Sequence, residues 1–247
     1  MKHLRTTQHI QNKQKKGLNK MDINNEITFP LVEHFISING EGRRAGQLAL
    51  FIRLAGCNLD CSYCDTKWAN KADVKFEKKT ILEIVDIVKK SNCKNVTLTG
   101  GEPLLKKDVD KLIAAILELD NIRLEIETNG SQSIKKYDDW ERRPVMTLDY
   151  KLASSGCEAA MDTENFNYLH KEDSVKFVSG SRADLERTLE IITKYDLTAK
   201  ANCIISPVFG QIEPVDIVDF MKEHEMNDVF LQLQMHKIIW DPNKQGV

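Results

Sequence analysis

The chain contains no apolar run that approaches the roughly 20 residues needed to span a membrane. Residues 2–20 contain no apolar stretch of the kind that a secretory signal peptide requires. No Pro-, Gly- or Ser-rich linker and no internal repeat divides the 247 residues. The formal net charge is only −2, so composition indicates neither a nucleic-acid nor a membrane partner. Free cysteines together with these absences predict a cytoplasmic protein.

The first 21 residues differ in composition from the rest. Residues 2–20 carry six Lys or Arg side chains, and no acidic residue precedes Asp22. Three interpretations stay open: a disordered basic tail, the remnant of a tag, and an upstream start codon before a natural Met21. We predict that residues 1–21 are a flexible basic extension and that residues 22–247 form one catalytic domain.

Three of the six cysteines lie in one short segment, Cys57, Cys61 and Cys64, with the spacing C-x3-C-x2-C. An odd number of thiols at such short spacings does not favour disulfides. Gly56 and Asn58 favour a loop over a helix. A structural zinc ion needs four protein ligands, whereas an iron–sulfur cluster can keep one iron open for chemistry. We therefore predict a three-cysteine cluster site.

Zinc stays open as an alternative, because a fourth ligand could come from elsewhere in the chain. The candidates for that ligand are Cys93, His170 and His236. The cysteines are followed directly by the oxygen pair Asp65-Thr66, which suits a hard cation. The remaining scattered cysteines have the default interpretation of buried, inert thiols.

The chain alternates between strand and helix patterns after residue 29. The predicted strands cover residues 47–54, 95–99, 123–128, 145–148, 174–178, 198–205 and 229–234, and the predicted helices cover 80–90, 105–119, 183–195 and 214–224. Residues 75–79 are interpreted as a solvent-exposed charged face. Alternation of this kind predicts an α/β fold with a mostly parallel sheet, arranged as a partial or complete barrel.

Distinctive motifs follow several of these strands. They are the cysteine segment, Gly100-Gly101-Glu102-Pro103, Asn129-Gly130, Asp149-Tyr150-Lys151 and Ser206-Pro207. The carboxyl ends of parallel strands form the binding face of α/β folds. We therefore expect the motifs to converge on one mouth.

Some single residues have both a structural and a functional interpretation. The segment 35–42 is either a strand with a tight turn or a polar lip over a substrate. Arg53 lies inside an apolar strand, where it suits either an ion pair or a substrate carboxylate. Glu102 could accept hydrogen bonds from an ammonium group. A lone histidine such as His236 is more often a packed or surface residue than a catalyst.

The cysteine spacing, together with Gly100-Gly101-Glu102-Pro103 after the next strand, resembles the radical S-adenosylmethionine (SAM) superfamily. The motifs Asn39-Gly-Glu-Gly42, Arg53-Leu-Ala-Gly-Cys57 and Cys64-Asp65-Thr66 are similar to those of the 7-carboxy-7-deazaguanine synthases. Glu127–Gly130, Asp149–Lys151 and Gln234–Lys237 agree with this. The resemblance spans residues 29–247.

The resemblance implies a modified, incomplete (β/α) barrel and conversion of 6-carboxy-5,6,7,8-tetrahydropterin into 7-carboxy-7-deazaguanine. Ammonia is lost, and the product feeds queuosine biosynthesis for transfer RNA. The implied cofactors are a [4Fe–4S] cluster, SAM and Mg2+. The implied partners are the pterin, an electron donor such as flavodoxin or ferredoxin, and a second copy of the chain.

The resemblance also implies a role for individual residues, none of them a catalytic side chain, because the radical derives from SAM. Cys57, Cys61 and Cys64 would hold the cluster, and Thr66 would ligate Mg2+. The implied SAM contacts are Tyr63, Cys64, Asp65, Gly101, Glu102, Asp149, Tyr150, Lys151, Ser206, Pro207, Val208 and Phe209. The implied pterin contacts are Ile38, Asn39, Gly40, Glu41, Arg53, Thr99, His236 and Val247.

Two positions depart from the family pattern. Asn39 stands where the family often has Gln, and the run Ser206–Phe209 fits only one branch. Two other functions stay open. One is a glycyl-radical activating enzyme, which shares the cluster and SAM but acts on a protein. The other is a non-catalytic binding module that a structural zinc ion stabilises.

Overall fold

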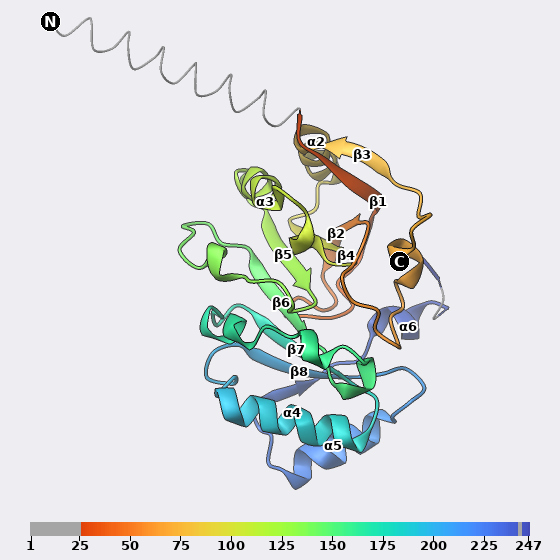
Figure 1. The fold of residues 1–247 in the computed structure, drawn as a ribbon, viewed down its shortest axis with the longest axis vertical. Helices are drawn as coiled ribbons and strands as arrows, with labels where there is room; N and C mark the ends of the chain where they lie inside the picture. Colours follow the sequence, from red (N-terminus) through yellow and green to blue (C-terminus); the bar gives the residue numbers. More distant parts are fainter. Residues whose placement is uncertain (1–25, 242–243) are drawn as a thin grey trace, which may run out of the picture.

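A curved sheet of nine strands organises the protein (Figure 1), whose computed structural model describes residues 26–241 and 244–247. The strands are β1 (Thr28–Ile38), β2 (Leu48–Leu54), β3 (Glu77–Thr80), β4 (Asn95–Gly100), β5 (Arg123–Thr128), β6 (Val145–Tyr150), β7 (Ser174–Ser179), β8 (Asn202–Pro207) and β9 (Val229–Leu231). The helices are α2 (Ile81–Ser91), α3 (Val109–Leu117), α4 (Arg182–Tyr195), α5 (Pro214–Glu223) and α6 (Met235–Ile239). The predicted extension at residues 1–21 lies outside the described residues. Within the described ranges, every helix is too short or too polar to cross a membrane.

The strand order is β3-β1-β2-β4-β5-β6-β7-β8-β9. Strand β2 and strands β4 to β9 are parallel to one another, whereas β1 is antiparallel to both β2 and β3. In the described part of the chain the sheet ends at β3 and at β9 without closing. This confirms the predicted fold class, an incomplete barrel with a mostly parallel sheet.

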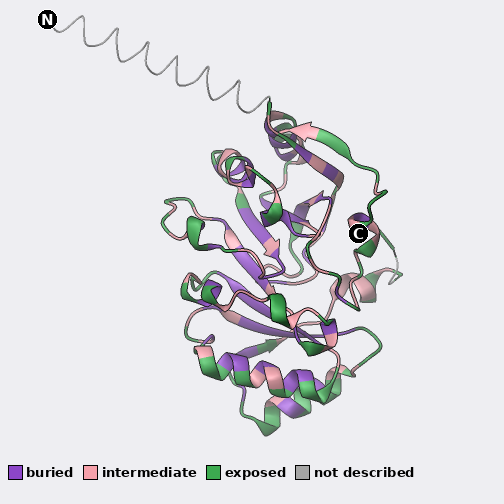
Figure 2. Ribbon diagram, viewed as in Figure 1, coloured by how far each residue is buried: buried purple, intermediate pink, exposed green. Residues whose placement is uncertain are grey.

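The two faces of the sheet differ in polarity, because side chains alternate along each strand. In β4, Val96 and Leu98 pack outward into a hydrophobic cluster with residues of α2 and α3, while Thr97 and Thr99 occupy the inner positions. A second cluster packs α4 and α5 against the outer face near β7 and β8. Figure 2 shows buried positions along the strands and on the sheet-facing sides of these helices. The apolar core therefore lies outside the barrel, and the interior is left for polar side chains.

Local signals set most helix boundaries. Helix α2 begins after Thr80, whose hydroxyl accepts from the Glu83 N–H at 3.2 Å while Glu83 accepts from the Thr80 N–H at 2.7 Å, as the capping pattern predicts. The predicted helix at 105–119 is wrong in its first turn. Asp108 has a left-handed φ of 60°, and it separates the short 3-10 helix η2 (Pro103–Leu105) from α3.

Two strands also differ from the prediction. Strand β8 begins at 202 and not at 198, because the N–H groups of Lys200 and Ala201 bond the Leu197 carbonyl in a turn. Residues 77–79, interpreted as part of a solvent-exposed face, belong to β3 and pair with β1. Their side chains are mostly exposed, and so their backbone pairing left no apolar signal.

Candidate functional site

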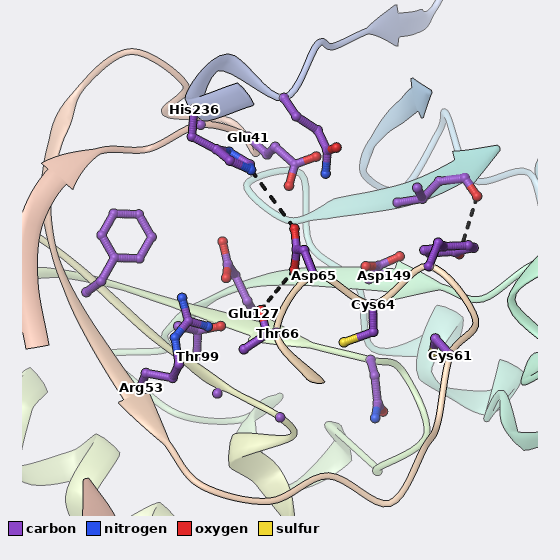
Figure 3. A pocket seen from close by; sticks show the side chains of 18 of the residues that line it. Glu41, Arg53, Cys61, Cys64, Asp65, Thr66, Thr99, Glu127, Asp149 and His236 are labelled. Carbon is purple, nitrogen blue, oxygen red and sulfur yellow. Dashed lines mark hydrogen bonds and ion pairs between the residues drawn. The ribbon is translucent and has the colours of Figure 1, made fainter. Parts of the chain in front are cut away.

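A cavity of about 510 Å3 lies inside the open barrel (Figure 3). Its walls come from the inner face of the sheet, the cysteine segment, α6 and the last residues of the chain. Of the residues predicted at the site, those on the cavity wall are Ile38, Gly40, Glu41, Arg53, Cys57, Cys61, Tyr63, Cys64, Asp65, Thr66, Thr99, Gly101, Asp149, Lys151, Val208, Phe209, His236 and Val247. The predicted convergence of motifs on one place therefore holds for most of them.

The three clustered cysteines all face the cavity from the loop that follows β2. The sulfur of Cys57 accepts from the Leu59 N–H at 3.4 Å and from the Asn129 side-chain amide at 3.6 Å. Burial raises the pKa of the Cys61 thiol to about 12 and also raises the pKa of Cys64. A metal would therefore have to displace protons from these thiols on binding.

The spacing of the thiols bears on the zinc alternative. Zn–S bonds of about 2.3 Å in a tetrahedron bring sulfurs within roughly 3.8 Å of one another. Among residues 26–241 and 244–247, no three His, Cys, Asp or Glu side chains gather closely enough to hold a single ion. Of the distant ligands considered for zinc, Cys93 packs against the outer core and His170 contacts Asp138 at 2.9 Å, so only His236 lines the cavity. The described residues therefore form no closed four-ligand zinc site.

Glu102 does not face the cavity, contrary to its predicted contact with an ammonium group. Its side chain is fully buried and accepts from the Leu104 N–H at 2.9 Å, the Thr128 hydroxyl at 3.0 Å and the Asn129 N–H at 2.6 Å. Burial raises its pKa to about 7, although these donors oppose the rise. Glu102 thus ties the end of β4 to the end of β5.

Three other predicted SAM contacts lie behind the cavity wall. Tyr150 occupies an outward position of β6, packs against Phe166 and Phe177, and its hydroxyl donates to Glu158 at 3.2 Å. Ser206 and Pro207 are buried at the end of β8, and the chain reaches the cavity only with the next two residues.

Buried charges from β6, β7 and the residues next to them line one wall of the cavity. The Lys176 ammonium lies 2.9 Å from the Glu41 carboxylate and 3.6 Å from Asp149, which also binds Lys151 at 2.7 Å. Burial lowers the pKa of Lys176, but Glu41, Asp149 and Glu127 more than offset it, so the pKa is raised. Burial likewise opposes ionisation of Asp149, yet Lys151 and Lys176 hold its pKa below the usual range. The wall therefore consists of paired, oppositely charged side chains. Figure 3 labels its carboxylates Glu41, Glu127 and Asp149.

Arg53 forms one of its two predicted interactions, an ion pair, and its contact with a substrate carboxylate stays a prediction. Its guanidinium pairs with Glu33 of β1 at 2.8 Å, and it also lines the cavity beside Thr99. Near them lies Glu127, whose carboxylate accepts a hydrogen bond from Thr99. Burial raises the pKa of Glu127.

Asn39 is the one predicted pterin contact that lies off the cavity wall. Its side-chain oxygen accepts from the Thr97 hydroxyl at 3.0 Å, and its amide nitrogen is buried without a partner. The shorter side chain therefore bonds the inner face of β4. It holds the turn in place and does not reach into the cavity.

The segment after β1, residues 39–47, lies at the amino ends of the parallel strands. We call it the floor loop. Because β1 is antiparallel to β2, Ile38 pairs with Leu48 at the start of β2. The loop then crosses the barrel, and Arg43 contacts Glu172, just before β7, at 2.6 Å. Of the two interpretations of residues 35–42, a strand with a tight turn agrees with the structure, and the polar segment lies at the floor of the cavity instead of forming a lip at its mouth.

Asp65 and Thr66 lie together at the side of the cavity nearest α6. The Thr66 hydroxyl donates to Asp65 at 2.9 Å, and Asp65 lies 3.7 Å from Lys237 and 4.0 Å from His236. Burial opposes ionisation of Asp65, but Lys237 and the Thr66 hydroxyl lower its pKa. Burial lowers the pKa of His236.

Among the charged residues that the structure brings into the cavity, the sequence prediction missed Lys176 and named Glu127 only as part of a motif. Each lies at an inner position of a buried strand, as Arg53 does. The argument made for Arg53, that a charge inside an apolar strand needs a partner, would have found both. Lys237 was seen only as part of a motif, although its ammonium also faces the cavity.

Comparisons with known proteins agree on one family. The sequence profile of the radical SAM superfamily matches residues 51–224. The 7-carboxy-7-deazaguanine synthase of Clostridium acetobutylicum is 53% identical over 90% of this chain and 100% of its own length. That of Leptospira interrogans is 34% identical over 87% of this chain and 96% of its own. The crystal structure of QueE from Escherichia coli superposes with a TM-score of 0.65 at 19% identity, covering 87% of this chain and 97% of that one, and so shares the fold.

Proposed function

Because the chain belongs to the 7-carboxy-7-deazaguanine synthase family of the radical SAM superfamily, we propose that it converts 6-carboxy-5,6,7,8-tetrahydropterin into 7-carboxy-7-deazaguanine with loss of ammonia. The reaction belongs to queuosine biosynthesis. One observation carries the proposal: a single cavity joins the three-cysteine loop to a wall of buried carboxylates and cations. Its volume of about 510 Å3 lies in the range of small-molecule sites.

Membership of the superfamily implies a [4Fe–4S] cluster and SAM. The cysteine loop fits the cluster, because three thiols face the cavity and two N–H groups donate to the Cys57 sulfur, as they commonly do to cluster ligands. When bound, the cluster and SAM supply the one-electron chemistry that removes hydrogen from the substrate. The chain's own residues bind, orient and exclude water.

We assign the SAM side to the wall formed by Asp149, Lys151, Val208 and Phe209. The Lys151 ammonium suits the carboxylate of SAM, and the Asp149 carboxylate suits ribose hydroxyls or the ammonium. Val208 and Phe209 offer apolar surface to an adenine ring. Gly101 allows close approach here, since a Cβ at this position would lie 2.6 Å from the Cys57 Cβ and 2.5 Å from the Gly56 carbonyl oxygen.

We assign the pterin to the part of the cavity wall next to the floor loop, where Glu41, Glu127 and Arg53 lie. A pterin presents a 2-amino group and ring N–H groups along one edge, which buried carboxylates can accept. One Glu41 oxygen binds Lys176, and the other is buried in the protein without a partner. Glu127 adds a second carboxylate. Arg53 supplies a planar donor for the substrate carboxylate.

Further assignments concern Mg2+, the electron donor, the oligomeric state, the compartment and the domain. Thr66 and Asp65 offer hard oxygen atoms at the cavity edge, which suits Mg2+. A flavodoxin or ferredoxin would deliver the electron. The protein would act as a homodimer in the cytoplasm, with residues 22–247 as one catalytic domain.

The test is anaerobic turnover of the reconstituted protein with the carboxy-tetrahydropterin, SAM, Mg2+ and a reductant. We expect 7-carboxy-7-deazaguanine by mass, with SAM required. The Cys61→Ala variant should form neither this product nor 5′-deoxyadenosine. The matched Cys93→Ala variant, which removes a thiol at the outer core, should retain both. A reconstituted protein that cleaves SAM but leaves the pterin unchanged would overturn the substrate assignment.

A further inference from the structure

The open barrel raises the question of what holds its two ends together. Strand β9 forms one edge of the sheet, and the antiparallel strands β3, β1 and β2 lie at the other edge. The segment after β9 nevertheless returns to the floor loop, since α6 lies beside it: a Cβ at Gly40 would come within 2.9 Å of the His236 ring. Figure 1 shows α6 on the side of the barrel where β1 and β2 lie.

One side chain makes a direct connection between the two ends. The Gln232 side-chain oxygen accepts from the Gly42 N–H at 2.6 Å, and its side-chain amide donates to the Gly42 carbonyl at 3.0 Å. Gln232 is itself attached to the sheet, because its backbone N–H donates to the Ile205 carbonyl of β8 at 2.9 Å. The side chain therefore satisfies both backbone groups of one floor-loop residue, as a neighbouring strand would.

Gly42 is closely fitted at this point. Its φ is +77°, and a Cβ would lie 2.6 Å from the buried Glu125 carboxylate. A side chain at position 42 would clash with the Glu125 carboxylate, so the loop backbone can lie this close to the barrel interior only because the residue is glycine. The floor loop has little freedom to shift while the Gln232 amide is in place.

Glu41 is the residue that this arrangement controls. It lies between two anchors, Gly42 held by Gln232, and Asn39, whose N–H donates to the Gln47 carbonyl at 2.8 Å and whose side chain binds Thr97. Its carboxylate spans the cavity to Lys176 at 2.9 Å. A shift of the loop would move the buried, unpartnered Glu41 oxygen relative to the wall.

We propose that Gln232 is a positioning residue that latches the open side of the barrel and sets the place of Glu41, and hence the affinity for the small-molecule substrate. This inference rests on the proposed function for its substrate, but the latch itself can be measured without turnover. The hydrogen bonds between Gln232 and Gly42 form within the protein and involve no cofactor, so they can be studied in the cofactor-free protein.

The test compares Gln232→Glu with Asn202→Asp. Glu at position 232 keeps the length and the acceptor but puts an oxygen against the Gly42 carbonyl. Asn202 is a matched control, because its side-chain amide also donates to backbone carbonyls, those of Lys171 and Asp173 at 3.1 and 2.9 Å. Amide hydrogen exchange of the cluster-free proteins, read on the peptide covering residues 39–47, reports on the latch. Steady-state kinetics report on its consequence.

We expect Gln232→Glu to speed exchange in residues 39–47 and to raise the KM for the pterin on the order of tenfold, the size expected when one buried polar group loses its partner. Its kcat at saturating pterin should change little. Asn202→Asp should change neither the exchange of this peptide nor the KM, even if it lowers the melting temperature equally. Unchanged exchange in Gln232→Glu overturns the latch. Faster exchange with an unchanged KM overturns its role in positioning Glu41. If the wild-type protein does not turn over the pterin, the proposed function fails while the exchange result still decides the latch.

Discussion

Replacing Lys176 with methionine isolates the energetic role of the buried charges. Lys176 is about nine-tenths buried and lies 2.9 Å from Glu41 and 3.6 Å from Asp149. At an effective dielectric constant of about 20, unit charges 3–4 Å apart attract by roughly 4–6 kcal/mol, much of which is offset by the cost of burying them. Removing one partner loses the attraction but leaves the buried carboxylates, so we expect the free energy of unfolding to fall by about 3–5 kcal/mol.

The assay is chemical denaturation at pH 7.5 of the protein without cofactors, with Lys222→Met as the control. Lys222 also pairs with a carboxylate, Asp219 at 2.6 Å, but both side chains are more than 60% exposed. We expect this control to lose no more than about 1 kcal/mol. At roughly 2–4 °C per kcal/mol for a domain of this size, Lys176→Met should also melt about 10 °C below wild type. A loss in Lys176→Met no larger than that of the control would refute the argument that burial makes this cluster of charges essential.

Three further predictions concern the metal, the cluster and pH. Thr66→Ala should raise the Mg2+ concentration needed for half-maximal turnover more than it weakens SAM binding; an unchanged Mg2+ dependence would exclude Thr66 as a ligand. Asn129→Asp removes the N–H donor to the Cys57 sulfur, so a redox titration followed by EPR should find a more negative cluster potential, and a potential equal to wild type would contradict this. Burial raises the pKa of Glu125 to about 7, above an unfolded value of about 4.3. The free energy of unfolding of the wild-type protein should therefore fall by on the order of 3 kcal/mol as pH rises from 4 to 8. In urea unfolding curves, the free energy of unfolding of Glu125→Gln should fall less over the same range.

The fold class followed from the sequence because strand and helix patterns alternate and the outer strand positions are apolar. The pattern does not predict whether a strand runs parallel or antiparallel to its neighbour. Nothing in residues 28–38 distinguishes an antiparallel first strand from a parallel one, yet β1 is antiparallel to β2 and carries the next segment to the opposite end of the barrel. The Lys-rich strand β3 was missed for a related reason, since an edge strand with exposed side chains has no apolar signal.

The prediction of the candidate site succeeded for some residues and failed for others for a similar reason. Motifs that depend on chain-local chemistry, such as the three cysteines, were found together and do face one cavity. Side chains whose direction depends on tertiary packing were assigned less well: Glu102 turns inward to bind three donors of the protein, and Tyr150 faces the outer core. Adjacent positions in a strand face opposite ways, so a motif that continues through a strand end, such as residues 149–151, cannot contribute every residue to one wall.

The antiparallel first strand also bears on the proposed assignment of two ligands to one cavity. The cysteine loop closes it at the carboxyl ends of the strands, and the floor loop, residues 39–47, closes it at the amino ends. Glu41 of the floor loop is linked to Lys151, near the cysteine loop, through Lys176 and Asp149, by contacts of 2.9, 3.6 and 2.7 Å. In the proposed arrangement, SAM beside the cysteines and the pterin beside the floor loop lie in series, with Asp149 and Lys176 at the wall between Lys151 and Glu41.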